Sequence, residues 1–327
     1  MDFAIFVVCA AAIGVAGPRL IDAIESIADE TGIGRVWLGA IVLAAATSLP
    51  ELVATVSAGA IGEADLAVGA VFGSNMFNMT ILGAFLALRP EALRPRGSES
   101  AVAMLAIGLA VLALVAVVTR DPGLGRLGGA SVALAVGYVL GSFVLYRRQR
   151  LRGPAVAVAG RGAVRRRRRP TVKTLATLLT GAGVVFVAAI FLADAAQGIA
   201  ETLEISGGVV GVVALAFATS LPEVVTSTVA WRRGASDLLV GNVLGSNVFN
   251  MAVLLPADVA FEDGGILAAV SEDQAAPAAF GIALMVLALL ALRGGRRPRV
   301  GRLLGLAIIG GYVAGAGVTV ALGVESG

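Results

Sequence analysis

The chain has 327 residues, of which 58% are hydrophobic and 14% charged, with a mean hydropathy of +0.92 and a formal net charge of +3. Soluble domains carry about 25% charged residues, so this composition excludes an ordinary soluble enzyme and indicates a membrane protein. Histidine is absent, and the single cysteine, Cys9, lies in an apolar run. These facts exclude Ser-His-Asp catalysis, histidine-ligated metals, disulfides and zinc clusters.

Ten apolar segments are long enough to cross a membrane, for which a helix needs about 20 residues. They predict an all-α polytopic membrane protein whose spans cover residues 3–27, 36–59, 65–88, 101–119, 127–146, 174–199, 207–230, 237–260, 276–293 and 302–322. The first segment has the short apolar core of a signal peptide, but no basic residue precedes that core. We therefore expect it to be a retained helix.

The distribution of basic residues among the loops predicts the orientation in the membrane. With the amino terminus outside, the inside loops would hold 23 of the 25 Lys and Arg residues, leaving only Arg120 and Arg126 outside. Lys and Arg are enriched in cytoplasmic loops, so we expect a multi-pass protein of the cell membrane with both termini outside. The basic residues thus reflect topology, and no nucleic-acid partner is expected.

The longest basic loop, residues 147–173, joins the fifth and sixth predicted spans and contains the run Arg165 to Arg169. One interpretation is a contact with anionic lipid headgroups or an intracellular regulator. A cytoplasmic linker that helps to set the orientation explains the same charges, and we favour it. The loop is too short to hold a folded regulatory domain.

Two sequence motifs each occur twice, and the copies are 172 residues apart in both cases. The hexapeptide ATSLPE occurs at Ala46–Glu51 and at Ala218–Glu223. The heptapeptide GSNxFNM occurs at Gly73–Met79 and at Gly245–Met251. Two motifs recurring at one spacing indicate an internal duplication.

The duplication divides the chain into two five-span halves, residues 1–146 and 174–327, with motif regions 36–88 and 207–260. Because five is odd, the second half enters the membrane from the opposite side. The halves are therefore predicted to be inverted repeats, an architecture in which transporters place their substrate site near the bilayer midplane.

Each copy of the first motif places a proline and a glutamate within an apolar span, as Pro50-Glu51 and Pro222-Glu223. A charge at the bilayer centre costs at least about 2.5–3.5 kcal/mol, and such groups usually line ion or substrate pathways. Proline also removes the helical partner of the carbonyl four residues earlier and breaks the helix. Freed carbonyls are tolerated at this depth where they line a cavity. The alternative, a glutamate that serves only helix packing, would have to occur twice.

Further polar residues are spaced so that pairs of them share a helical face. The pairs are Thr47 and Glu51, Ser74 and Asn78, and Ser246 and Asn250. Carboxylates, hydroxyls, amides and carbonyls are hard oxygen ligands, which suit Ca²⁺ and Na⁺ but not soft metals. The sequence therefore predicts a cation site between the two halves.

These motifs resemble the cation/Ca²⁺ exchanger superfamily, most closely its prokaryotic sodium/calcium exchanger branch. The doubled ATSLPE and GSNxFN motifs carry the resemblance, which the ten-span layout extends over nearly the whole chain. It implies that Glu51 and Glu223 chelate Ca²⁺ with help from the carbonyls of Thr47 and Thr219. It further implies flanking Na⁺ sites built from serines and carbonyls at Ser48, Ser74, Ser220, Ser246, Ala44 and Ala216, and a sliding movement of the first and sixth spans.

One departure from the family pattern lies at the end of the GSNxFN motif. Many relatives that exchange sodium for calcium have an aspartate in one copy, whereas this chain has Asn78 and Asn250. The fixed charge of the site then cannot exceed −2, which one Ca²⁺, two Na⁺ or two H⁺ would neutralise. Electrogenic exchange with a third Na⁺ is allowed but not required, and potassium co-transport is not expected.

We expect a secondary antiporter rather than an enzyme, exchanging Ca²⁺ for Na⁺ by alternating access at a midplane site around the two glutamates. The nearest alternative is a Ca²⁺/H⁺ exchanger that uses the same glutamates. Another is a cation channel with rings of carboxylates or carbonyls. No cofactor and no obligatory protein partner are expected; the partners are Ca²⁺, Na⁺ or H⁺, and membrane lipid.

Overall fold

A computed structural model describes residues 1–93, 98–121, 123, 127–151, 169–202, 218–294 and 297–325. Its long helices are α1 (Asp2–Thr31), α5 (Ala64–Leu88), α6 (Glu99–Thr119), α7 (Gly129–Leu151), α8 (Val172–Thr202), α11 (Ser236–Ala260), α13 (Ala275–Arg293) and α14 (Pro298–Glu325). The shorter ones are α2 (Arg35–Trp37), the π-helix η1 (Leu38–Leu43), α3 (Ala44–Thr47), α4 (Leu49–Ala60), η2 (Pro90–Ala92), α10 (Leu221–Arg232), α12 (Ile266–Ala269) and η3 (Glu272–Gln274).

Within the described ranges, eight helices are long and apolar enough to cross a membrane. Residues Arg35–Thr47 and Leu49–Ala60 form a ninth candidate span that is bent by 51° at its break. The expected span 207–230 lies partly in residues 203–217, outside the described part of the chain. The all-helical, multi-span prediction is therefore confirmed for eight or nine segments.

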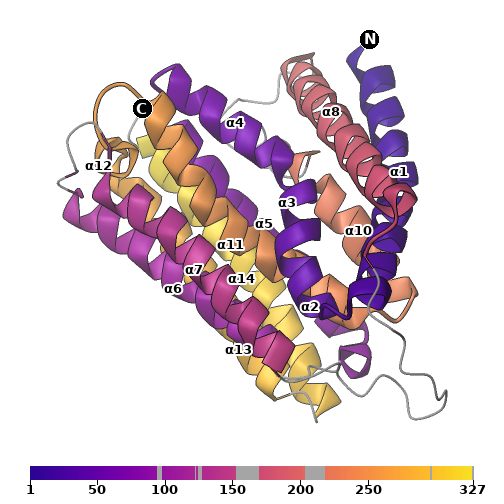
Figure 1. Cartoon of the computed structure of the whole chain (residues 1–327). Coiled ribbons are helices and arrows are strands. Elements are labelled where there is room, and N and C mark those ends of the chain that lie inside the picture. Colours follow the sequence, from indigo (N-terminus) through magenta and orange to yellow (C-terminus); the bar gives the residue numbers. More distant parts are fainter. Residues whose placement is uncertain are drawn as a thin grey trace, which may run out of the picture.

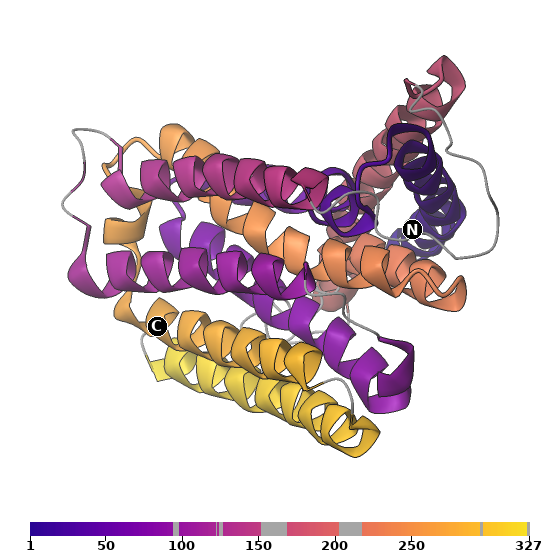
Figure 2. The ribbon, with the colours of Figure 1, turned by 60° about the horizontal axis from the view of Figure 1, so that its bottom comes forward.

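The helices are arranged as a bundle with a helix pair at one edge (Figure 1). α11 runs through the bundle and packs against α4, α5, α6, α7 and α10. α13 and α14 lie side by side along α5. α1 and α8 pack against each other, and both views place this pair at the edge of the bundle (Figures 1 and 2).

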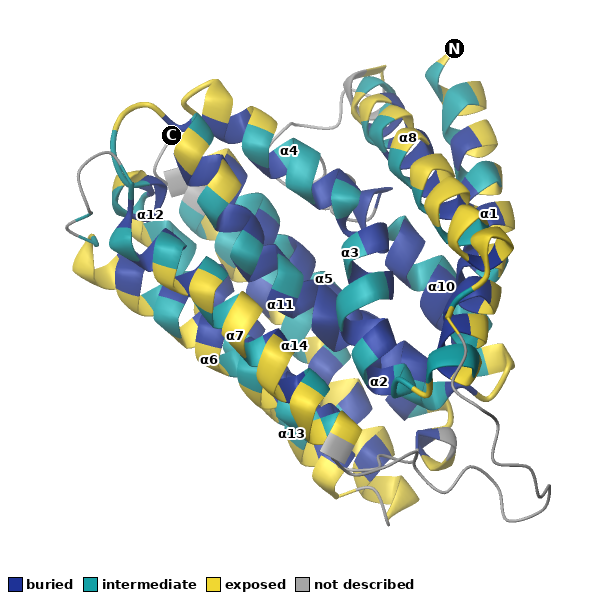
Figure 3. Cartoon of the chain, in the orientation of Figure 1, coloured by how far each residue is buried: buried dark blue, intermediate teal, exposed yellow. Residues whose placement is uncertain are grey.

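The outer faces of the bundle are largely exposed, whereas α11 is largely buried (Figure 3). Large apolar side chains are exposed on α6, α7 and α8, among them Val118, Val139 and Phe191. Soluble monomers rarely expose contiguous apolar patches of more than a few hundred Å². These faces are therefore suited to lipid, and the arrangement agrees with a membrane protein.

Glycines bring α11 close to the broken span. A Cβ placed at Gly241 would lie 2.7 Å from the carbonyl oxygen of Val36, and one placed at Gly245 would overlap the backbone of Ala40. Only glycine permits these approaches of two backbones. The close contact between α11 and the broken span therefore depends on these two glycines.

The duplication seen in the motifs extends to the limits of the helices. α4 and α10 each have 12 residues, and α5 and α11 each have 25. The bounds of each pair differ by 172 residues, the same offset as the motifs. Equivalent residues in the two copies therefore occupy equivalent places on equivalent helices.

Candidate cation-binding site

The predicted break at Pro50 lies at the centre of the site. The helix stops at Ser48, whose φ of −94° and ψ of 14° are not helical, and resumes at Leu49. Among the described residues, no backbone N–H donates to the carbonyls of Ala46 or Thr47. The loss of these helical bonds follows from the missing N–H of proline and from the bend. The break at Pro50 is thus confirmed, and it frees carbonyl oxygens beside Glu51.

A π-helix precedes this break. η1 covers six residues, Leu38–Leu43, and widens the helical turn before α3. Such segments are rare and are frequently found at functional sites. Here the widened turn packs on α11 close to Gly241 and Gly245. The broken span is therefore irregular on both sides of the short helix α3.

The two glutamates are paired crosswise with serines of the opposite motif copy. Ser48 Oγ donates to Glu223 Oε1 at 2.8 Å, and Ser220 Oγ donates to Glu51 Oε1 at 3.2 Å. Ser246 Oγ on α11 also donates to Glu223 Oε1, at 3.2 Å. Reciprocal contacts of this kind arise where two copies of one unit face each other across a twofold relation.

Both glutamates are buried, with exposed fractions of 4% for Glu51 and 0% for Glu223. Within the described ranges, the second carboxylate oxygen of each, Oε2, has no hydrogen-bond partner. Among the described residues, neither glutamate forms an ion pair with a lysine or arginine. A buried carboxylate without a cationic partner is costly. The arrangement is therefore stable when a cation or protons neutralise the pair.

The rest of the site is neutral. The described residues contain no cluster of three or more His, Cys, Asp or Glu side chains that could hold a metal. The Thr47 side chain lies beside Glu223, and the Thr219 side chain lies beside Glu51. The chemistry available is thus two carboxylates surrounded by hydroxyl, amide and carbonyl oxygens, a donor set that suits hard cations.

The carbonyl of Ala44 is already engaged in this conformation. It accepts the backbone N–H of Ser48 at 2.9 Å, and the Thr47 hydroxyl lies 3.2 Å from it. The same hydroxyl lies 3.3 Å from Asn242 Oδ1. The Ala44 oxygen thus accepts one backbone N–H, and the single proton of the Thr47 hydroxyl can go either to this oxygen or to Asn242 Oδ1.

A cluster of four asparagines joins α5 to α11 within the GSNxFNM motifs. Asn78 Nδ2 donates to Asn247 Oδ1 at 3.0 Å, and Asn250 Nδ2 donates to Asn75 Oδ1 at 3.1 Å. Asn247 Nδ2 donates to the backbone carbonyl of Asn75 at 3.1 Å. The amide oxygens of Asn78 and Asn250 have no partner in the part of the chain that the structure describes.

The structure brings together most of the residues that the sequence singled out. Buried contacts link the members of the set formed by Thr47, Ser48, Glu51, Thr219, Ser220, Glu223 and Ser246. Ser74 is buried on α5, but no hydrogen bond from it to Glu51 occurs among the described residues. Ala216 lies outside the described residues.

Sequence reasoning missed three buried asparagines that organise this region, Asn75, Asn242 and Asn247. Asn75 and Asn247 lie inside the doubled GSNxFNM motif, so their repetition was a signal that could have found them. Asn242 has Ala70 as its counterpart 172 residues earlier, and only its tertiary contacts reveal it.

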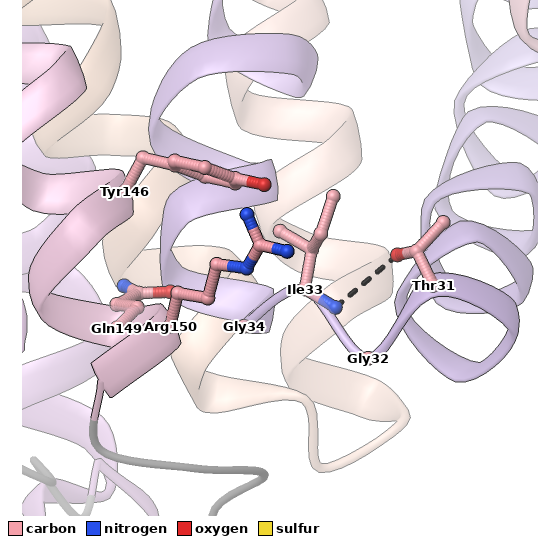
Figure 4. A pocket seen from close by; sticks show the side chains of 7 residues that line it. All are labelled: Thr31, Gly32, Ile33, Gly34, Tyr146, Gln149 and Arg150. Carbon is pink, nitrogen blue, oxygen red and sulfur yellow. Dashed lines mark hydrogen bonds between the residues drawn. The ribbon is translucent and has the colours of Figure 1, made fainter. Parts of the chain in front are cut away.

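Two hollows lie away from the glutamates. One, of about 200 Å³, lies between the α1–α2 turn and the end of α7, where Tyr146, Gln149 and Arg150 face Thr31–Gly34 (Figure 4). The other, of about 600 Å³, is an apolar groove between α1 and α8 lined by residues such as Val8, Val15 and Val184. Neither contains a residue of the predicted cation site.

A polytopic helical protein with two buried carboxylates in a site of oxygen donors belongs to the class of membrane ion transporters. Comparison with known proteins gives the family. The sequence model of the family "Sodium/calcium exchanger protein" matches residues 1–146 and 173–320. The chain therefore belongs to the sodium/calcium exchanger family, whose members are transporters.

Individual relatives cover most of the chain. The inner membrane protein YrbG of Escherichia coli (strain K12) is 30% identical over 304 residues, which are 90% of this chain and 89% of YrbG. The putative antiporter CaxA of Alkalimonas amylolytica is 27% identical over 303 residues, 90% of this chain and 91% of CaxA. A solved structure of the sodium-calcium exchanger NCX_Mj shares the fold, with a TM-score of 0.73, 21% identity and 96% of each chain covered.

Proposed function

We propose that this chain is an antiporter that exchanges Ca²⁺ for Na⁺ by alternating access at one site around Glu51 and Glu223. The observation that carries the proposal is the crosswise pairing of these two buried glutamates with Ser220 and Ser48. Each carboxylate retains an unpaired oxygen, and neither has a cationic side chain as partner in the described chain. Membership of the sodium/calcium exchanger family supports the choice of ions.

Electrostatics explain why such a site exchanges ions rather than leaking them. Two glutamates give the site a fixed charge of −2 when both are ionised. One Ca²⁺ or two monovalent cations neutralise this charge. An empty site would have to carry two uncompensated charges through the closed state in the membrane, which is costly. The conformational change is therefore favourable only with one or the other cargo bound.

We assign the ligands by their place around the glutamates. The unpaired carboxylate oxygens and the freed Thr47 carbonyl bind Ca²⁺, together with the Thr219 carbonyl in the second copy. Na⁺ binds at the flanking hydroxyls and amide oxygens of Ser48, Ser74, Ser220, Ser246, Asn78 and Asn250, and at the carbonyls of Ala44 and Ala216. The Ala44 carbonyl already accepts the Ser48 N–H, so it can bind Na⁺ through its other lone pair when the Thr47 hydroxyl donates to Asn242 instead.

We also infer ten spans in two inverted halves, residues 1–146 and 174–327, joined by the cytoplasmic linker 147–173. The matching bounds of α5 and α11 support this duplication. Both termini then lie outside and the Arg-rich linker inside, as the positive-inside distribution requires. The α1–α8 pair, placed at the edge of the bundle, is suited to slide across it as access alternates (Figure 2).

Purified protein in lipid vesicles tests the function directly. Vesicles loaded with Na⁺ should take up labelled Ca²⁺, and a pH gradient without Na⁺ should drive little uptake. Glu51→Gln and Glu223→Gln should each reduce uptake by about a hundredfold or more, because a neutral amide no longer balances the cation charge. Glu262→Gln, which alters an exposed glutamate, is the matched control and should leave uptake unchanged.

Other outcomes identify the alternatives. Uptake driven by the pH gradient alone would make the protein a Ca²⁺/H⁺ exchanger using the same glutamates. Ca²⁺ current without any counter-ion requirement would make it a channel. Normal exchange in either glutamine variant would overturn the site assignment.

A further inference from the structure

The four asparagines between α5 and α11 form a hydrogen-bond network with a definite direction. All four side chains are buried, so each amide group must find its partner inside the protein. An amide NH₂ can only donate and an amide oxygen can only accept. The hydrogen-bond partners of each amide therefore determine whether its NH₂ group or its oxygen remains available to a ligand.

The direction is set by Asn247. Its Nδ2 lies 3.1 Å from the backbone carbonyl of Asn75, which is an acceptor and cannot donate. This contact fixes the rotation of the Asn247 amide and presents Oδ1 on its other side. Asn247 Oδ1 then receives Asn78 Nδ2 at 3.0 Å. Within the described ranges, Asn78 is left with its NH₂ group engaged and its oxygen, Oδ1, unpaired.

An unpaired and buried amide oxygen is a ready cation ligand. Asn78 lies one helical turn after Ser74 on α5, and its counterpart Asn250 lies one turn after Ser246, whose hydroxyl contacts Glu223. Resting on the function proposed above, we propose that Asn247 is a positioning residue: it holds the amide of Asn78 so that the oxygen, and not the NH₂ group, faces the transported cation.

The second copy of the arrangement is weaker. Asn250 Nδ2 donates to Asn75 Oδ1 at 3.1 Å, and the Asn250 oxygen has no partner among the described residues. Among the same residues, Asn75 Nδ2 has no partner either, and no contact equivalent to that of Asn247 with the backbone fixes the Asn75 amide. Asn78 is therefore held through two successive hydrogen bonds, and Asn250 through one.

The network also explains why an amide suits position 78 in this chain. An aspartate at position 78 would have no N–H to donate, and its carboxylate oxygen would face Asn247 Oδ1, which is also an acceptor. The Asn247 amide would have to flip to donate to it, and the flip would break the hydrogen bond to the Asn75 carbonyl. The Asn247 orientation thus favours a neutral ligand at position 78 and keeps the fixed charge of the site at that of the two glutamates.

The test is a double-mutant cycle on Ca²⁺ binding, measured by calorimetry with the full-length protein in detergent and Ca²⁺ as the only titrant. Asn247→Leu and Asn78→Ala should each weaken Ca²⁺ binding by about tenfold. The double variant should be no weaker than either single variant, because Asn247 acts only through Asn78. Asn75→Leu leaves the Asn75 backbone carbonyl in place and is the control: its effect should add to that of Asn78→Ala.

Three results would overturn the proposal. Independent effects of Asn247→Leu and Asn78→Ala, giving about a hundredfold loss in the double variant, would overturn the proposal. Equal coupling of Asn75 and Asn247 to Asn78 would do the same. If Asn247→Leu does not fold, Asn247→Ser replaces it in the same cycle with the same criterion. If the unmodified protein binds no Ca²⁺, the proposed function fails and this inference fails with it, whereas binding with an additive cycle removes the inference alone.

Discussion

α5 and α11 are two copies of one helix with different surroundings. Both have 25 residues and carry the GSNxFNM motif at equivalent positions. Among the described residues, α11 contacts α5, α6, α7, α10 and both parts of the broken span, whereas α5 packs mainly against α4, α11, α13 and α14. In the most apolar 18-residue stretch of each helix, 83% of residues are buried in α11 and 67% in α5.

The more central copy carries additional polar residues. Asn242 and Asp258 in α11 correspond to Ala70 and Leu86 in α5. Asp258 accepts the backbone N–H groups of Gly128 and Ile266 at 2.7 and 2.6 Å, and Asn242 joins Thr47 to Thr226. Duplication thus supplies the shared ligand motif, and α11 has acquired contacts that hold other segments around the site.

The largest effect should come from replacing Asp258 by leucine, the residue at the equivalent position 86 of α5. Asp258→Leu leaves two buried N–H groups without their acceptor, and bonds to a charged group contribute about 1.5–3 kcal/mol each. We expect a loss of about 3 kcal/mol or more and a thermal midpoint lowered by about 5 °C or more, measured on purified protein in detergent. Asp258→Asn keeps one acceptor oxygen and should lose less. A midpoint unchanged in Asp258→Leu would show that these bonds do not stabilise the fold.

The second difference concerns the motif serines. Ser246 donates to Glu223, whereas no such bond from Ser74 to Glu51 occurs in the described residues. Ser246→Ala removes a hydroxyl that donates to the Glu223 carboxylate. We expect Ca²⁺ affinity without Na⁺ to fall by about tenfold, because this contact holds the carboxylate in place for the cation.

Ser74→Ala is the matched variant in α5. It should change Ca²⁺ affinity by less than about twofold under the same conditions, because it removes no hydrogen bond to a glutamate. Equal losses of Ca²⁺ affinity in both serine variants would show that Ser74 and Ser246 contribute equally to Ca²⁺ binding, and would contradict this difference between the copies.

The third difference between the copies concerns Asn242, whose replacement should have a smaller effect than that of Ser246. Asn242→Ala frees the Thr47 hydroxyl from one partner and leaves the backbone of the broken span unchanged. One neutral hydrogen bond corresponds to about a threefold to tenfold change in an equilibrium constant. We expect the Ca²⁺ concentration that gives half-maximal exchange to rise by about threefold. Ala70→Ser, at the equivalent position of α5, should have no measurable effect. A larger change in this Ca²⁺ concentration in Ala70→Ser than in Asn242→Ala would show that the α5 position, and not the α11 position, has the greater effect on exchange.

Much of this molecule could be predicted from local sequence. The predicted spans 65–88 and 237–260 agree within one residue with α5 (Ala64–Leu88) and α11 (Ser236–Ala260), because a long apolar run has a stable helical form in lipid. The break at Pro50 follows from the chemistry of one residue. The doubled motifs identified Glu51 and Glu223 as unusual, since a carboxylate has no ordinary place in an apolar span.

The class of protein, the duplication and the two glutamates could therefore be predicted from the sequence alone, because they depend on local patterns and on the cost of burying charge. The partners of these residues depend instead on how the helices pack. Ser48 meets Glu223 across 175 positions, and Asn247 meets the Asn75 carbonyl across 172. Nor does any local pattern reveal that α11, rather than α5, occupies the more buried place. Such contacts depend on how the two copies face each other, and hydrogen-bond direction is fixed only when donor and acceptor are brought together.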